Sequence, residues 1–330
     1  VHCELSNLDL DGQVQGNLTV QPGRAPVIDI QGRLNRGNGT AVWRYLPRQV
    51  GDDAYLWVKR GILGGTSPET TLTLRGSLDR YPFDKGGGLL QIAIRMQDGV
   101  LDYATNWPRI TGINGWLTFR NNTMTLDAEH GQILGARLET VKVVIPDLYY
   151  SPDTMLTVTG QASGPTAAFL DFIRQSPVNE YMGRFTDEMK ATGPGRLHLQ
   201  LVMPLSEIDR TRVAGRFVPQ DDSIALNDQL PGLTNVTGAL NFTDAGVKGE
   251  GLGARLFGQP IAISLASAKG GRVHASATGS LTAATLARWL PDALDRRISG
   301  GTRAQADIVL RPRSVDLKLN SNLAGLAIDL

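Results

Sequence analysis

This sequence of 330 residues has little of several features that would assign it to a familiar class of protein. It contains a single cysteine, Cys3, so no disulfide can form within the chain. No run of 18 apolar residues occurs, which excludes a transmembrane helix within this sequence. The 33 basic and 32 acidic side chains nearly cancel, and this balance argues against nucleic acid as a partner, since that function needs a basic surplus.

Side chains arranged for catalysis or metal binding are also scarce. The segment Asn7–Gly12 resembles the start of a calcium loop, but the position that needs a bidentate glutamate is Leu18. The histidines lack the spacing to a second ligand that metal sites show, and they are His2, His130, His198 and His274. The sequence therefore predicts no enzyme, no cofactor and no metal site.

What the sequence does contain is alternation of apolar and polar residues with a period of two. This pattern is typical of β-strands that have one apolar and one polar face. The 38 glycines, and the pairs Asp11–Gly12, Asn38–Gly39 and Asp98–Gly99, predict many turns. We therefore expect a mostly β protein with an antiparallel sheet. The residues expected on its apolar face are Leu90, Ile92, Ile94, Met96, Leu197, Leu199, Leu201, Met203, Ile261, Ile263 and Leu265.

Three segments interrupt this alternation and are predicted to be short kinked helices. Each begins with a threonine that could cap the helix, is broken by a proline, and is followed by a pair of glycines. The predicted helical stretches are 40–46 with 52–60, 166–173 with 179–190, and 282–290 with 292–297.

The strands between these helices also resemble one another, which predicts a repeat of about 120 residues with about five strands. Ile110–Phe119 aligns with Leu233–Phe242, and Gly135–Leu138 aligns with Gly253–Leu256. The separation between the two copies is five residues smaller at the second match than at the first, which predicts a shorter hairpin in the second copy. The predicted units are the end of one repeat (1–39), two full repeats (40–165 and 166–281) and the start of another (282–330).

Several segments in a fixed order give the whole chain a resemblance to a known family. They are Trp43–Pro47, Leu78–Phe83, Leu101–Pro108, Ile110–Phe119 and Leu201–Leu205. Together they resemble the YhdP family of large AsmA-like proteins of the Gram-negative cell envelope, which are similar to TamB. The resemblance implies an elongated, curved antiparallel sheet of repeating β-groove units with an apolar inner face.

The resemblance also implies a function and a location. Members look like periplasmic bridges that carry phospholipids between the inner and outer membranes, with the acyl chains as binding partners. An N-terminal helix would tether the protein to the inner membrane. We expect this chain to be an internal fragment of such a protein, because it starts at Val1 and ends within an alternating segment at Leu330.

Two other functions stay open at this stage. A closed β-solenoid scaffold that aids outer-membrane assembly would have the same alternation but a dry, packed core. An enzyme on a β-solenoid would need a cluster of charged residues on one face, and the sequence shows none. Trp43, Tyr45, Tyr55 and Trp57 of the first helical segment could contact lipid or could pack against the end of the sheet.

Overall fold

The computed structural model of the chain describes residues 2–47, 50–148, 154–182, 184, 186–228, 230–268, 272–286, 297–311 and 314–329. The chain divides into two units. Unit 1 comprises residues 1–162 and 199–212, and unit 2 comprises residues 163–198 and 213–330. In the described part, an open antiparallel sheet of 20 strands dominates the fold, and the helices are few and short. The prediction of a mostly β protein with an antiparallel sheet is therefore confirmed.

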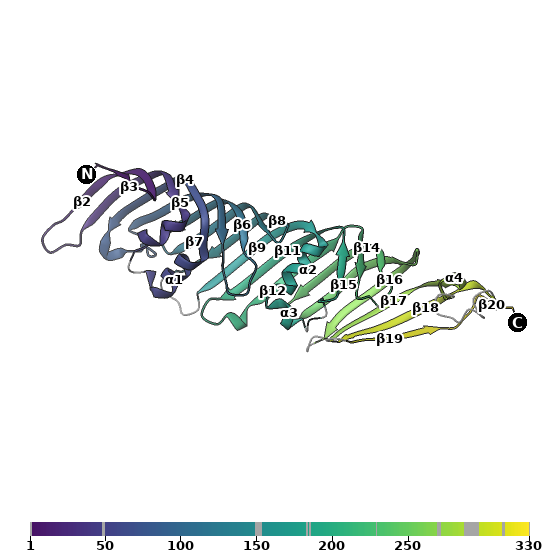
Figure 1. Ribbon diagram of the computed structural model, residues 1–330. Helices are drawn as coiled ribbons and strands as arrows, with labels where there is room; N and C mark the ends of the chain where they lie inside the picture. Colours follow the sequence, from purple (N-terminus) through teal and green to yellow (C-terminus); the bar gives the residue numbers. More distant parts are fainter. Residues whose placement is uncertain are drawn as a thin grey trace. The chain divides into compact units, whose positions relative to one another are not determined.

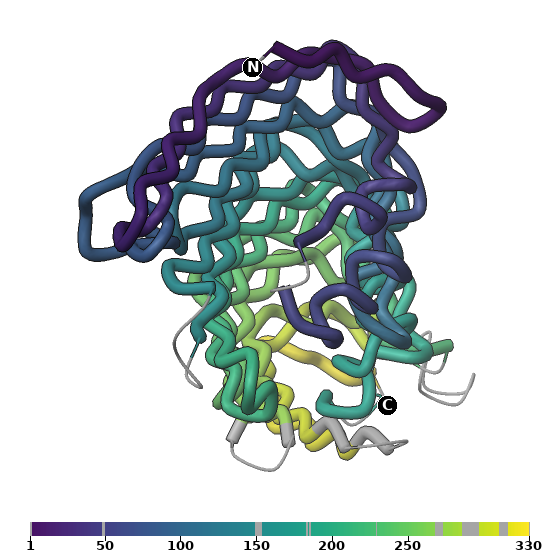
Figure 2. Tube along the Cα trace, turned by 90° about the vertical axis from the view of Figure 1, so that its left-hand side faces the viewer, coloured from purple at the N-terminus to yellow at the C-terminus, as the bar shows by residue number. Residues whose placement is uncertain are grey.

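In unit 1 each strand from β1 to β8 pairs with the next strand along the chain (Figure 1). Figure 2 shows that the strands of this unit bend along their length. Their bounds are β1 (His2–Ser6), β2 (Leu10–Thr19), β3 (Val27–Asn38), β4 (Ile62–Ser77), β5 (Gly88–Leu101), β6 (Ile110–Arg120), β7 (Thr123–Ile133) and β8 (Ala136–Ile145). The next strand, β9 (Met155–Pro165), runs from unit 1 into unit 2.

The first predicted helical segment lies between β3 and β4. It consists of η1 (Gly39–Tyr45) and α1 (Asp52–Gly61), and two shorter 3-10 turns, η3 (Leu78–Arg80) and η4 (Ile208–Arg210), also belong to this unit. The helical segment expected over 40–46 is present as η1, and it is a 3-10 helix. Its cap is Asn38 rather than Thr40, since the Asn38 side chain accepts a hydrogen bond from the backbone N–H of Thr40.

Unit 2 begins with short helices and continues as another run of antiparallel strands. Its elements are α2 (Thr166–Arg174), α3 (Val178–Tyr181), β10 (Lys190–Thr192), β12 (Arg212–Pro219), β13 (Asp222–Ala225), β14 (Leu233–Thr243), β15 (Gly246–Leu256), β16 (Gln259–Ala268), β17 (Arg272–Thr282), α4 (Ala283–Leu286), β18 (Ile298–Arg311), β19 (Ser314–Ser321) and β20 (Leu326–Ile328). Strand β11 (Pro194–Pro204) starts in unit 2 and ends in unit 1.

The second helical prediction is confirmed over 166–173, which forms α2, but its second part is too long, and the third prediction lies only partly within the described residues. The helix expected over 179–190 ends at Tyr181, and Lys190 already belongs to β10. Arg184 has a φ of 62°, the left-handed conformation that commonly ends a helix. Helix α4 does begin after a threonine cap, because Thr282 Oγ1 accepts from the N–H of Thr285 at 3.3 Å. The rest of that prediction, residues 287–296, lies outside the described residues.

Two of the predicted turns are β-bulges instead. The register of β2 against β3 shifts between Asp11 and Gly12, and the register of β5 against β6 shifts around Asp98–Gly99. An Asp-Gly pair can adopt the positive φ of a bulge as readily as that of a hairpin turn, so the dipeptide alone could not distinguish them. The third pair, Asn38–Gly39, does end a strand and leads into η1.

Three consecutive strands recur at a constant separation along the chain. Strands β6, β7 and β8 begin at positions 110, 123 and 136, and β14, β15 and β16 begin at 233, 246 and 259, a separation of 123 residues for each pair. The expected shorter hairpin in the second copy is therefore wrong. Gly135 lies in the β7–β8 turn, whereas Gly253 lies within β15, so that short sequence match does not align equivalent positions. The boundaries of the repeats stay a prediction.

Candidate functional site: an apolar sheet face

The pairing of β2 through β8 aligns apolar residues into continuous rows on one side of unit 1. Residues directly opposite each other in paired strands lie on the same face of a sheet. One row crosses seven strands as Val14, Gly32, Leu72, Ile92, Phe119, Met124 and Ile145. The next row is Gly12, Leu34, Thr70, Ile94, Leu117, Leu126 and Val143. We call these two rows the apolar face of unit 1.

The opposite face of the same strands is largely polar. Its corresponding row is Gln13, Arg33, Thr71, Ala93, Thr118, Thr125 and Val144. A bidentate pair joins two strands on this side, because Arg95 donates to both carboxylate oxygens of Glu129 at 2.7 and 2.9 Å. That hydrogen-bonded guanidinium keeps the pKa of Glu129 below its ordinary value. Unit 1 therefore has one face suited to water and one suited to apolar contacts.

Unit 2 has the same two-sided character. Its apolar face consists of two rows. The strand pairs align Leu252, Ile263, Ala277, Ala306 and Leu319 across β15 to β19, and Leu265, Ala275, Ile308 and Leu317 across β16 to β19. The opposite side aligns Ser264, Ser276, Asp307 and Lys318. Alanines occupy several of the apolar positions, so this face has smaller side chains than the one in unit 1.

The residues predicted for the apolar face lie where the alternation placed them. Ile92 and Ile94 are part of the two rows of unit 1, Leu90 and Met96 extend the same side of β5, and Ile263 and Leu265 lie in the rows of unit 2 with Ile261 beside them. In β11 the predicted residues Leu197, Leu199, Leu201 and Met203 are half-buried, whereas the intervening Arg196, His198 and Gln200 are exposed. Whether these residues bind a ligand stays a prediction.

Many members of the apolar face were not in the predicted set. The missed residues of unit 1 include Val14, Leu34, Leu72, Leu117, Phe119, Met124, Leu126 and Val143. The alternation that could have identified these residues is present in the sequence but weak, because threonine and glycine interrupt it, as in Thr70-Thr71-Leu72-Thr73-Leu74 of β4. Only the strand pairing shows that these scattered residues form common rows.

The apolar face of unit 1 is half-buried rather than buried. Leu72, Ile92 and Phe119, near the middle of the row, all retain partial exposure, although Ile145 at its end is buried. The inner face of a β-sandwich packs against a second sheet and excludes water almost completely. Partial exposure of central residues indicates that no second sheet of the described part packs on this face.

An aromatic ring closes one end of this face. Gly76 and Gly88 are paired across β4 and β5, on the side that carries Leu74 and Leu90. The buried ring of Phe83, from the β4–β5 connection, fills the space beside both glycines, since a Cβ at Gly76 would be 2.7 Å from Phe83 Cε1. Asn121 holds this connection in place, because its Nδ2 donates to the carbonyl of Phe83 and its Oδ1 accepts from the N–H of Leu90.

The other ends of these strands carry η1, α1 and an aromatic cluster. Trp43 of η1 packs edge-on against Tyr55 of α1, with ring centroids 6.0 Å apart. Trp57 is 42% exposed, and its indole N–H donates to the carbonyl of Tyr103 at 3.0 Å. Trp43 and Tyr55 are therefore half-buried packing residues, whereas Trp57 is available to a ligand or to solvent.

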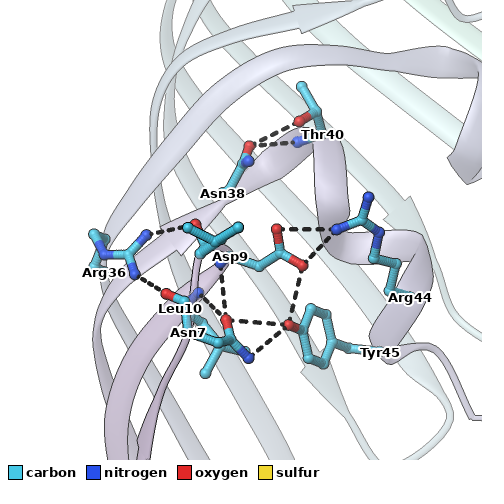
Figure 3. Close-up of polar contacts among 9 residues, drawn as sticks. Asn7, Asp9, Leu10, Arg36, Asn38, Thr40, Arg44 and Tyr45 are labelled. Carbon is cyan, nitrogen blue, oxygen red and sulfur yellow. Dashed lines mark hydrogen bonds and ion pairs between the residues drawn. The ribbon is translucent and has the colours of Figure 1, made fainter.

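A polar network fixes η1 to the β1–β2 connection (Figure 3). Arg44 pairs with Asp9 at 2.9 Å, and the hydroxyl of Tyr45 donates to the same carboxylate at 3.2 Å. Asn7 Nδ2 donates in turn to the Tyr45 hydroxyl at 3.1 Å. This network explains why Tyr45, although 47% exposed, has a defined position.

In unit 2 a helix packs against an aromatic residue of the sheet. Phe169 of α2 meets Phe217 of β12 with centroids 5.2 Å apart. Nearby, Asp222 is fully buried, and the Thr166 hydroxyl at the start of α2 donates to its Oδ2. Asp222 Oδ1 has no hydrogen-bond partner among the described residues. Burial raises the pKa of Asp222 above its ordinary value.

No group of three or more His, Cys, Asp or Glu side chains in the described ranges is placed to hold a metal ion. Within those same ranges, none of the helices has both the length and the apolarity that crossing a membrane requires.

Comparison with known proteins places the chain in a family. Residues 2–330 match the family described as YhdP protein. The chain is 23% identical over 279 residues to the intermembrane phospholipid transporter YhdP of Escherichia coli (strain K12), an alignment that covers 83% of this chain and 22% of that protein. The chain thus spans about a fifth of the length of this relative, and no solved structure matches it. Because the family match covers nearly every residue, the chain belongs to the YhdP protein family.

Proposed function

We propose that the apolar faces of the two units bind the acyl chains of phospholipids and form part of a path for lipid between the inner and outer membranes. The observation that carries this proposal is the half-buried apolar face of unit 1, whose rows continue across seven strands. An uncovered apolar surface of this extent is typical of a binding site for an apolar ligand. The name of the Escherichia coli relative, an intermembrane phospholipid transporter, agrees with a lipid as that ligand.

Physical chemistry explains how such a face would both hold and pass on a lipid. Removing apolar area from water contributes about 25 cal/mol per Å², so acyl chains bind without specific polar contacts. Neighbouring rows present similar side chains, such as Ile92 and Ile94 on adjacent rows of β5. A step from one row to the next therefore exchanges like contacts for like, and lipid movement needs no catalytic residue.

The finer features of this proposal come from the family. Each unit would be one segment of a curved groove in a periplasmic bridge. The bend of the strands of unit 1 in Figure 2 agrees with such a groove. The inner-membrane tether would lie in another part of the protein. A closed scaffold is disfavoured because the central residues of the apolar face keep partial exposure.

The test is lipid uptake by the 330-residue chain from phosphatidylglycerol vesicles, measured by native mass spectrometry and by lipid extraction. We expect the wild-type chain to take up phospholipid and an Ile94→Asp variant to take up at least tenfold less, because a carboxylate would interrupt the apolar row. Ala93→Asp is the matched control, since Ala93 is the neighbouring residue on the polar face of the same strand.

Folding of the variants must be checked separately by circular dichroism and thermal unfolding. If Ile94→Asp fails to fold, Ile94→Asn tests the same position without a charge. A folded wild-type chain that takes up no lipid, or equal losses in the Ile94 and Ala93 variants, would contradict the proposal and favour the closed scaffold.

A further inference from the structure

A cavity of about 350 Å³ lies in unit 1 beside the C-terminal end of α1 and the loop between β5 and β6. Its volume is within the usual range for small-molecule sites, roughly 300 to 1,000 Å³. The residues that line it are Arg60, Asp102, Ala104, Thr105, Asn106, Trp107 and Arg109. Two guanidinium groups, a carboxylate, an amide and a hydroxyl thus line this space, and Ala104 and Trp107 are the apolar residues among the described residues of its lining.

The charges around this cavity leave one cation without a counter-ion. Arg109 pairs with Asp102, with 3.0 Å between Nε and Oδ2. Arg60 is exposed and has no acidic partner within ion-pairing distance among the described residues. The lining therefore has a net charge of +1, and guanidinium groups are well suited to bidentate hydrogen bonds with phosphate.

The backbone holds these charges in fixed relation. The N–H of Asp102 donates to the carbonyl of Gly61 at 2.8 Å, which ties the end of β5 to the end of α1. Arg60 immediately precedes Gly61, and the ion pair to Asp102 orients Arg109. Arg60 is therefore supplied by α1 and Arg109 by the loop between β5 and β6, and the hydrogen bond from Asp102 joins the start of that loop to the end of α1.

Aromatic residues lie beside the cavity. Tyr103 and Trp107 are neighbours with ring centroids 6.0 Å apart, and Trp57 donates to the carbonyl of Tyr103. Burial, followed by the charge of Asp102, raises the pKa of Tyr103 far above its ordinary value, so its hydroxyl stays neutral. Tyr and Trp favour boundaries where an apolar region meets a wet one.

The cavity follows directly from a strand of the apolar face. Strand β5 contributes Ile92 and Ile94 to that face, ends at Leu101, and is followed at once by Asp102. Along the chain, the aliphatic side chains of β5 are followed by Asp102, then by the aromatic Tyr103 and Trp107, and then by Arg109, which pairs with Asp102. Aliphatic, aromatic and cationic groups thus lie close together in this segment, and a glycerophospholipid likewise joins acyl chains, a glycerol region and a phosphodiester.

We propose that this cavity binds the phosphate of a phospholipid headgroup, with Arg60 and Arg109 as the ligands, while the acyl chains lie on the apolar face of unit 1. This inference rests on the proposed function and adds a headgroup site to it. It assigns Arg60 the principal role, because Asp102 already neutralises Arg109.

The experiment compares two lipids that differ only in the phosphate-containing headgroup. The 330-residue chain is incubated with vesicles that contain equal amounts of phosphatidylglycerol and the matching diacylglycerol, and bound lipid is extracted and quantified. We expect the wild-type chain to prefer phosphatidylglycerol and an Arg60→Glu variant to lose this preference by about tenfold, with diacylglycerol uptake unchanged. Arg75→Glu is the control, because Arg75 is an exposed arginine of β4 in the same unit.

The possible outcomes separate the two proposals. Equal uptake of both lipids by wild type, or no effect of Arg60→Glu, would overturn the phosphate site and leave the apolar groove intact. Absence of both lipids from the folded wild-type chain would overturn both proposals. A second arm titrates inorganic phosphate by calorimetry, and tight binding that Arg60→Glu abolishes, without any lipid preference, would identify a site for free phosphate and overturn the headgroup assignment.

Discussion

The ring of Phe83 occupies the space beside Gly88 that a side chain at this glycine would otherwise fill. Phe83 is 1% exposed and lies in the connection between β4 and β5. The two residues together close one end of the apolar face of unit 1, since Gly88 shares the side of β5 that carries Leu90.

Replacement of Phe83 by alanine should destabilise unit 1. We expect a loss of about 3 kcal/mol or more in the free energy of unfolding, because the change removes a buried ring and leaves a cavity over two glycines. The free energy of unfolding is measured by urea denaturation, with tryptophan fluorescence as the probe. Leu8→Ala is the control, since Leu8 is 94% exposed and should change stability very little. Equal effects of the two changes would show that the ring does not hold the end of the sheet.

Removal of the Asp9 carboxylate should release η1 from the β1–β2 connection. In an Asp9→Ala variant Arg44 and Tyr45 lose a shared partner, so the amides of residues 39–45 should exchange with solvent faster. Hydrogen–deuterium exchange with mass spectrometry measures this, and the exchange of β6 to β8 should not change. Asp127→Ala removes an exposed carboxylate of β7 and provides the comparison. Unchanged exchange in residues 39–45 would mean that packing alone positions η1.

Asp222 should make the stability of unit 2 depend on pH. Burial raises its folded-state pKa above the value of 3.8 expected for an exposed aspartate, so ionisation is costly in the fold. The stabilising contribution of the neutral form is complete below the unfolded pKa and is lost as the pH rises through the folded pKa. Relative to Asp222→Asn, the wild-type chain should therefore lose stability as the pH rises from the unfolded value of 3.8 through the higher folded-state pKa.

Urea denaturation of both proteins across that range measures the difference. Asp228→Asn is the control, because Asp228 is 85% exposed and pairs with Lys190 at the surface. A difference between wild type and Asp222→Asn that does not vary with pH would contradict the prediction.

The apolar face of unit 2 should also bind acyl chains. We expect Ile263→Asp to reduce lipid uptake from phosphatidylglycerol vesicles, because Ile263 lies in the middle strands of an apolar row. The measurement is the amount of lipid bound per folded chain. Ser264→Asp is the matched control on the opposite face of β16. Normal uptake in the Ile263 variant would restrict lipid binding to unit 1.

The alternation in the sequence was a good guide to strands and to faces. Leu90, Ile92, Ile94 and Met96 lie on one side of β5 as expected, because the two-residue period of a strand is a local property. The interpretation of Asp11–Gly12 and Asp98–Gly99 as turns failed, because their conformation depends on the strands beside them. The helix expected over 179–190 was too long, because α3 ends at Tyr181, Arg184 has a positive φ, and Lys190 already belongs to a strand.

The candidate headgroup site could not be predicted from the sequence. Arg60 lies at the end of a helix and Arg109 lies almost fifty positions later, after β5, with no spacing that links them. The hydrogen bond between Asp102 and Gly61 brings these segments together. The same holds for the burial of Asp222 beside Thr166, because the two residues are far apart in the sequence.

The sequence by itself determined that this protein is built from strands with one apolar face, that it has one cysteine and balanced charge, and that it resembles the YhdP family. The strand pattern, the cysteine count and the charge balance follow from composition and from short periods, which depend only on neighbouring residues. The resemblance rests instead on several short segments that occur in a fixed order. Only the tertiary structure decided the strand register, and with it which residues form continuous rows, because register depends on contacts between distant segments. It also decided that Phe83 closes one end of the apolar face and that a cationic cavity lies beside the last residue of β5.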